Sequence, residues 1–115
     1  MTDERDRTFL LDMSEAAQRI LRYLGDRSQA DLDSDDMLLD AVVRQFEVLG
    51  EAARSVSPGT RERWPRIPWR AMIGMRNQLI HAYKAVDTAA VWRTAHEDLP
   101  ALLTALRSAT EQGRG

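Results

Sequence analysis

Apolar residues recur every three to four positions along most of this 115-residue sequence, and this spacing constrains the fold more than any other feature. Such spacing puts the apolar side chains on one side of an α-helix. No segment alternates between apolar and polar residues with period two, so no β-strand is expected. Two long amphipathic helices are predicted first, over 5–24 and 35–56. Their inner faces hold Phe9, Leu10, Met13, Ala16, Ala17, Ile20, Leu21 and Leu24 in the first, and Leu38, Ala41, Val42, Gln45, Phe46, Leu49, Ala52, Ala53 and Val56 in the second.

Capping and helix-breaking residues then divide the rest of the chain. Asp33 or Ser34 is expected to cap the second helix, and the Ser-Pro-Gly run at 57–59 to end it. The connector over 61–69 has room for one short turn before Pro65, and a third helix is predicted from Pro68 to about 80–83. A last helical segment, capped by Asp87 or Thr88, should reach about residue 109.

Pro100 lies inside that last segment and leaves two alternatives. The helix kinks there, or Asp98 caps a new helix with Pro100 in its first turn. Either way the prediction is an all-α fold, an antiparallel bundle of four to five helices. We expect a single domain over 1–115, with a frayed tail from about 110.

Composition excludes several classes of protein. The chain has no cysteine, so disulfides and thiolate metal sites are excluded. Its charged N-terminus does not resemble a signal peptide, and no apolar run is as long as a membrane span, so we expect a cytoplasmic protein without membrane contacts. With two histidines and no HExxH motif, no metal site is expected. The acidic run at 31–36 lacks calcium-loop spacing. Phosphate-loop, GxSxG and dinucleotide-binding motifs are absent, so no cofactor is expected.

Charge is distributed unevenly along the chain. Residues 1–60 carry 7 basic and 13 acidic side chains, whereas residues 61–84 carry 6 basic and 1 acidic. A local basic patch can hold a polyanion even on a protein whose net charge is -2. The alternative is that these arginines are a solvated surface that pairs with the acidic half.

The unusual segment is GMRNQLIHAY at 74–83. On a helix, Arg76 falls in the middle of an apolar face made by Trp69, Met72, Ile73, Leu79, Ile80 and Tyr83. A guanidinium on such a face keeps its charge and must have partners. Either Arg76 pairs with a carboxylate such as Glu51 and joins two helices, or this face borders a cleft or a subunit interface where Arg76 meets an anion.

His81 shares its edge of the helix with Asn77, four residues earlier, and lies 140° from Arg76 on an ideal helix. Arg76 and His81 can meet one substrate only if the helix loosens near His81 or if two copies of the chain bring their motifs together. The residues suit RNA cleavage without a metal. A histidine can take the proton of the 2′-hydroxyl, and an arginine can stabilise the charge on the phosphorane. A plain interaction domain remains the alternative.

The segment from Ile67 to Trp92, IPWRAMIGMRNQLIHAYKAVDTAAVW, resembles the signature region of the HepT-like branch of the HEPN superfamily. The shared pattern is Arg-x4-His-x-Tyr, and flanking matches extend to the Gly-Glu-Ala at 50–52 and the Leu-Pro at 99–100. The resemblance implies the toxin of a type VII-like toxin–antitoxin system. Such a toxin is a metal-independent endo- or exoribonuclease that works as a homodimer, with its motif lining the cleft between subunits.

By this resemblance, Arg76 and His81 would be catalytic and Asn77 and Tyr83 supporting. Tyr83 would also be the residue that the partner antitoxin, a minimal nucleotidyltransferase, modifies with AMP. Arg66, Arg70 and Lys84 are candidate contacts to RNA phosphates. The alternative within the superfamily is a non-catalytic module that binds a nucleotide or a partner protein.

Overall fold

The computed structural model describes residues 3–82 and 85–112, and this part of the chain is built from α-helices without a strand. Five helices have ten or more residues and two have six. Their bounds are α1 Glu4–Leu24, α2 Gln29–Ser34, α3 Asp36–Ser55, α4 Pro58–Arg63, α5 Trp69–Ile80, α6 Thr88–Glu97 and α7 Leu99–Gln112. The all-α prediction is confirmed.

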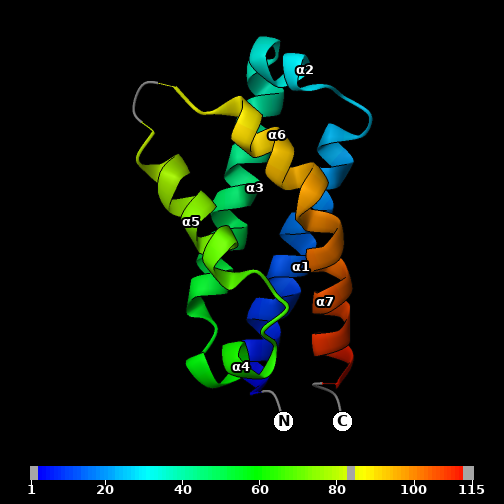
Figure 1. The fold of residues 1–115 in the computed structure, drawn as a ribbon, viewed down its shortest axis with the longest axis vertical. Coiled ribbons are helices and arrows are strands. Elements are labelled where there is room, and N and C mark those ends of the chain that lie inside the picture. The colour runs from blue at the N-terminus through cyan, green and yellow to red at the C-terminus, as the bar shows by residue number, and fades with distance from the viewer. Residues whose placement is uncertain (1–2, 83–84, 113–115) are drawn as a thin grey trace.

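The longer helices surround one core, with α1 and α5 running in one direction and α3 and α7 in the opposite direction (Figure 1). α3 packs against α1 on one side and α5 on the other, and α7 packs along α1. The short α4 lies at the end of the bundle that holds both termini, and α2 lies at the opposite end. Apolar side chains from all the longer helices form one buried cluster, which contains Phe46, Leu49, Met72 and Leu102. The described helices include none that is long and apolar enough to cross a membrane.

The acidic run at 31–36 folds differently from the prediction. Asp33 and Ser34 lie inside α2, and the cap of α3 is Asp35, whose side chain accepts from the Leu38 N–H at 3.0 Å. The extra helix forms because Ser28 and Asp31 make a capping box, in which each side chain accepts a hydrogen bond from the other residue's backbone. The cap prediction was therefore wrong by one or two residues.

The Ser-Pro-Gly run ends α3 as predicted, and the next helix, α4, starts at once. Ser57 is the N-cap of α4 but makes no side-chain cap of its own. Asp6 of α1 instead binds two residues at the start of this helix, Ser57 and Thr60. Its carboxylate accepts from the Ser57 N–H at 3.1 Å, from the Ser57 hydroxyl and from the Thr60 hydroxyl at 2.6 Å. Asp6 is 2% exposed, so this contact joins the start of α1 to α4 inside the protein.

The C-terminal segment follows the second of the two predicted alternatives. Asp87 caps α6 by accepting from the Ala90 N–H at 3.1 Å, as predicted. The helix ends at Glu97, and a separate α7 begins at Leu99. The carbonyl of Asp98 accepts the Leu102 N–H at 3.0 Å, so Pro100 lies in the first turn of α7, where its missing N–H breaks no helical bond.

Candidate active site

The position of Arg76, the first catalytic candidate, depends on a close contact between α5 and α3. A Cβ atom on Gly50 would lie 2.3 Å from the Cβ of Arg76 and 2.8 Å from the carbonyl oxygen of Met72. These distances are too short for any side chain, so the two helices touch backbone to backbone at Gly50. The contact sets Arg76 directly beside Glu51, the residue that follows Gly50.

The buried face of α5 differs from the predicted one. Met72, Met75 and Leu79 are buried, whereas Ile80 is 42% exposed. Trp69, Ile73 and Arg76 are half-buried. The buried face is centred nearer Met75 than the spacing predicted, and Gly50 of α3 approaches α5 at Met72 and Arg76. Arg76 therefore lies at the edge of the apolar face and not in its middle.

Arg76 is held by two partners. Its Nε atom lies 2.9 Å from Oε2 of Glu51, and its Nη1 atom donates to Oδ1 of Asn77 at 2.8 Å. The predicted pairing with Glu51 is confirmed. The ion pair engages Nε and the hydrogen bond engages one N–H of Nη1, and the other three guanidinium N–H groups have no partner among the described residues. The Arg76 side chain is 19% exposed, so these donors remain within reach of a ligand.

Arg76 opens onto a hollow of about 390 Å³ between α1, α3 and α5. We call it the Arg76 hollow. Both acidic and basic side chains line this hollow. Its lining residues are Phe9, Asp12, Arg44, Glu47, Val48, Glu51, Ala52, Ser55, Arg76 and Ile80.

His81 follows directly after the last residue of α5. Its backbone, at φ −94° and ψ 6°, leaves the helical path, and its ring is exposed. The Nδ1 atom lies 2.7 Å from the carbonyl oxygen of Asn77. A carbonyl only accepts hydrogen bonds, so Nδ1 carries the proton. The Nε2 atom of the neutral ring then has a free lone pair.

Asn77 therefore holds both catalytic candidates, Arg76 through its side chain and His81 through its backbone. The helix does end at His81, as one of the two predicted alternatives required. Even so, His81 is not among the residues that line the Arg76 hollow. A single chain orients the two residues but does not bring them to the same cavity.

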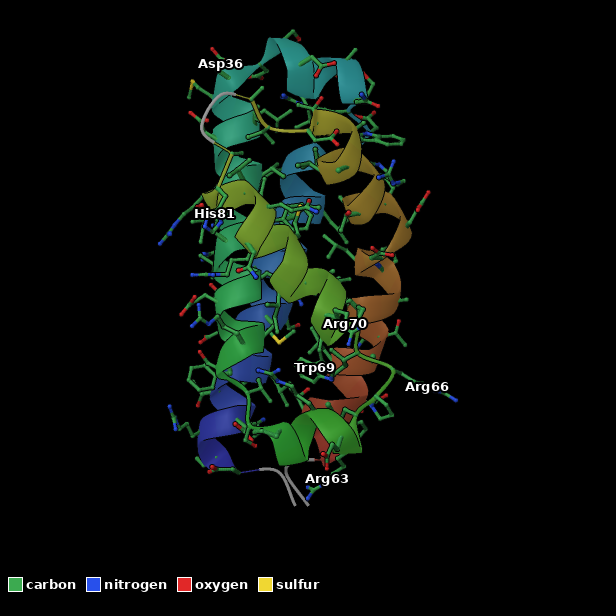
Figure 2. All side chains as sticks on the ribbon, turned by 60° about the vertical axis from the view of Figure 1, so that its left-hand side comes forward. Asp36, Arg63, Arg66, Trp69, Arg70 and His81 are labelled. Atoms are coloured by element: carbon green, nitrogen blue, oxygen red, sulfur yellow. The ribbon has the colours of Figure 1, made fainter. Side chains whose placement is uncertain are left out.

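The candidate phosphate contacts lie before α5, in its first turn, or outside the described residues. Arg66 in the connector and Arg70 in the first turn of α5 are exposed, and neither forms an ion pair with a described residue. Figure 2 shows Arg70 at the end of α5 opposite His81, and Arg66 pointing away from the body of the protein. Tyr83 and Lys84 lie outside the described residues.

A second hollow beside Asn77 was missed by the sequence analysis. It measures about 420 Å³ and is lined by Arg61, Trp69, Arg70, Ile73, Gly74 and Asn77. We call it the Gly74 hollow. Its signal in the sequence is the four-residue spacing of Trp69, Ile73, Asn77 and His81, which places these side chains along one ridge of a helix.

The described part of the chain contains no group of three histidine, cysteine, aspartate or glutamate side chains placed to bind a metal ion. The guanidinium of Arg76 and the imidazole of His81 are both bonded to Asn77.

A family model and individual relatives of this chain agree on its family. The family model described as "Ribonuclease HepT-like" matches residues 13–109. A protein of Thermococcus cleftensis named "Probable ribonuclease HepT" is 37% identical over 94 residues, which are 82% of this chain and 86% of that protein. A "Putative RNase" of Methanocaldococcus jannaschii is 35% identical, with the same coverage of each chain. No solved structure matches the chain significantly. The family model and both relatives match most of the chain. The chain therefore belongs to the HepT-like ribonuclease family.

Proposed function

We propose that this protein is a metal-independent ribonuclease, the toxin of a toxin–antitoxin pair, and that Arg76 and His81 are its catalytic residues. The family and the names of the relatives support RNA as the substrate. The observation that carries the proposal is the double role of Asn77. One residue holds the guanidinium of Arg76 and the imidazole of His81, and it leaves Nε2 of His81 free.

The proposed reaction uses the nucleophile that RNA carries itself. Nε2 of His81 takes the proton of a 2′-hydroxyl, and the 2′-oxygen attacks the adjacent phosphorus. The bond from phosphorus to the 5′-oxygen breaks, and that oxygen takes a proton from water or from His81 of a second copy of the chain. The products are a 2′,3′-cyclic phosphate end and a 5′-hydroxyl end.

Arg76 would stabilise the charge that builds up on the phosphate oxygens. Three of its N–H groups remain for this task, and Glu51 and Asn77 hold the guanidinium in place beforehand. Donors arranged in advance need no reorganisation during the reaction, which is the reason such groups are effective.

We propose further that two chains form the complete site around a two-fold axis. Within one chain His81 lies outside the Arg76 hollow, and the exposed Ile80 borders that hollow, where a second copy would cover it. Light scattering at micromolar concentration should give the mass of a dimer. A monomer mass would contradict the shared site without contradicting the role of His81.

The partner would be a nucleotidyltransferase antitoxin that adds AMP to Tyr83. An added AMP would put a bulky anion two residues after His81 and would exclude an RNA phosphate by charge and by size.

Cleavage of RNA in EDTA tests the proposed function. We expect wild-type protein to cut and His81→Ala to lose activity. His96→Ala is a close control because His96 is also exposed, and its Nδ1 atom also bonds the carbonyl one turn earlier, that of Trp92 at 2.9 Å. His96→Ala should cut like wild type.

Equal cleavage by wild type and His81→Ala would reveal a contaminating nuclease. Absence of cleavage by an unmodified wild-type protein would favour the second candidate, a non-catalytic binding module. The ion pair between Arg76 and Glu51 is the observation that favours this alternative, because it gives Arg76 a role in joining α3 to α5.

A further inference from the structure

Gly74 has no explanation in the packing of this chain. It lies in the middle of α5, where glycine weakens a helix relative to alanine. A Cβ atom on Gly74 would meet no atom within 4 Å, whereas one on Gly50 would collide with Arg76. Glycine also occurs where a ligand approaches the backbone closely. A close contact with a ligand outside the chain would account for a glycine at this position.

The Gly74 hollow is suited to a polyanion. Two guanidinium groups, those of Arg61 and Arg70, line it, and no carboxylate does. The Arg76 hollow has three carboxylates, Asp12, Glu47 and Glu51 (with Arg44 and Arg76 as its basic residues). A nucleic-acid strand that reaches His81 would meet less repulsion on the side of the Gly74 hollow.

Two of the lining side chains are fixed before any ligand arrives. The Trp69 indole donates to the carbonyl of Trp64 at 3.1 Å, and Arg61 donates to the carbonyls of Val56 and Arg54 at 3.1 and 2.8 Å. Arg70 is exposed and forms no ion pair with a described residue. The hollow thus combines a fixed aromatic ring with a basic side chain that is free to reach a phosphate, as in sites for single-stranded nucleic acid.

One residue that lines the hollow, Asn77, is hydrogen-bonded through its carbonyl to the candidate catalytic histidine. Trp69, Ile73, Asn77 and His81 are each four residues apart, and Figure 2 shows Trp69 and Arg70 at one end of α5 and His81 at the other. From Ile73 to His81 the helix rises about 12 Å. This equals the length of about three or four stacked nucleotides at about 3.4 Å each.

We propose that the Gly74 hollow seats one nucleotide of a single-stranded RNA substrate, a few nucleotides from the bond that is cut. The base lies against Trp69, Arg70 contacts a phosphate, and the absence of a side chain on Gly74 lets the strand lie close to the helix. This site rests on the proposed ribonuclease function and adds to it the direction from which the substrate enters.

Cleavage kinetics on a short single-stranded RNA test the site. Gly74→Leu fills the hollow, and Gly59→Leu is the matched control, because Gly59 also has open space for a Cβ atom but lies in α4, outside the hollow. We expect Gly74→Leu to raise KM at least tenfold with little change in kcat, and Gly59→Leu to match wild type. Circular dichroism checks that both variants are helical.

Salt dependence gives a second measurement that does not rely on the glycine. Arg70→Gln should weaken binding and lower the slope of log affinity against log salt by about 0.7, the value for one phosphate of a single strand. Arg93→Gln, at an exposed position on α6, is its control and should leave the slope unchanged.

The outcomes separate this proposal from the one on which it rests. No RNA cleavage or binding by wild type would overturn the proposed function, and this site with it. Cleavage by wild type with unchanged KM in Gly74→Leu and unchanged slope in Arg70→Gln would overturn the site alone. If Gly74→Leu changes the mass in light scattering while Arg70→Gln keeps the slope, the hollow is a contact between copies, and the RNA site is wrong.

Discussion

The Nδ1 atom of His81 lies 2.7 Å from the carbonyl oxygen of Asn77, so the first residue after α5 is tied to the residue that also holds Arg76. The bond to His81 uses the backbone of Asn77 and the bond to Arg76 uses its side chain. Substitution at position 77 can therefore release Arg76 while His81 keeps its partner.

Asn77→Ala should lower kcat for RNA cleavage about 10- to 100-fold, because a misplaced guanidinium stabilises the transition state less well. The fold should be unaffected since Asn77 is exposed. Gln78→Ala, the exposed neighbour on the same helix, serves as the control in the same assay. Full activity in Asn77→Ala would show that Arg76 needs no support from Asn77.

Arg76→Ala should lower kcat about 10²- to 10³-fold, the effect of removing one donor to a charged transition state. Glu51→Gln should have a smaller effect on kcat. It should change the free energy of unfolding by less than about 1 kcal/mol, because Glu51 is 57% exposed and solvent screens the pair. Kinetics and urea unfolding of both variants check this. If Arg76→Ala and Glu51→Gln lower the free energy of unfolding by the same large amount, the ion pair is mainly structural.

Two glycine-to-alanine substitutions should change stability in opposite directions. Gly50→Ala should destabilise the protein by about 1–3 kcal/mol, because its Cβ would overlap Arg76 and the Met72 carbonyl. Gly74→Ala should stabilise it by up to about 1 kcal/mol, because alanine favours the helix and meets open space. Thermal unfolding followed by circular dichroism measures both. A destabilised Gly74→Ala would mean that the surroundings of Gly74 are tighter than the structure shows.

The buried Asp6 should make stability depend on acid pH. Burial raises the pKa of Asp6, but hydrogen bonds from Ser57 and Thr60 to the carboxylate outweigh it and hold the pKa below its ordinary value of 3.8. A carboxyl with a lowered folded-state pKa stabilises the protein above the unfolded-state pKa. This stabilisation is lost as the pH falls through the folded-state pKa.

Asp6→Asn should therefore destabilise the protein by about 2–3 kcal/mol at pH 7. The difference from wild type should shrink steadily as the pH falls below about 3.8. Urea unfolding across this range measures the difference, and Asp40→Asn, at an exposed position on α3, is the control. A difference that stays constant down to pH 2 would contradict the role of the Asp6 charge.

If the proposed nucleotidyltransferase antitoxin adds AMP to Tyr83, Tyr83→Phe should escape modification. The chain has two tyrosines, so Tyr23→Phe is the matched control and should still be modified. Intact mass after incubation with the partner and ATP gives the result. AMP on Tyr83→Phe would assign the modification to another residue.

The sequence by itself determined the five longer helices, because apolar spacing, Asp87 and the Ser-Pro-Gly run act locally. Helical spacing predicted the inner faces of α1 and α3, and the Arg-Asn-x-x-x-His pattern located the candidate site before any contact was known. Local signals were insufficient at 31–36, where the Ser28 and Asp31 capping box competed with a later cap and formed α2.

Only the tertiary structure decided what each face of α5 contacts. The spacing of α5 allows several rotations of its apolar face, and the observed packing buries Met75 and leaves Arg76 at the edge, against Gly50 of α3. The partners of Arg76 and Asp6 also come from distant parts of the chain. Glu51 lies 25 residues before Arg76, and Ser57 lies 51 residues after Asp6. No local rule chooses among the many carboxylates and hydroxyls of a helical protein. The packing of whole helices makes that choice, because it sets which side chains come within hydrogen-bond distance.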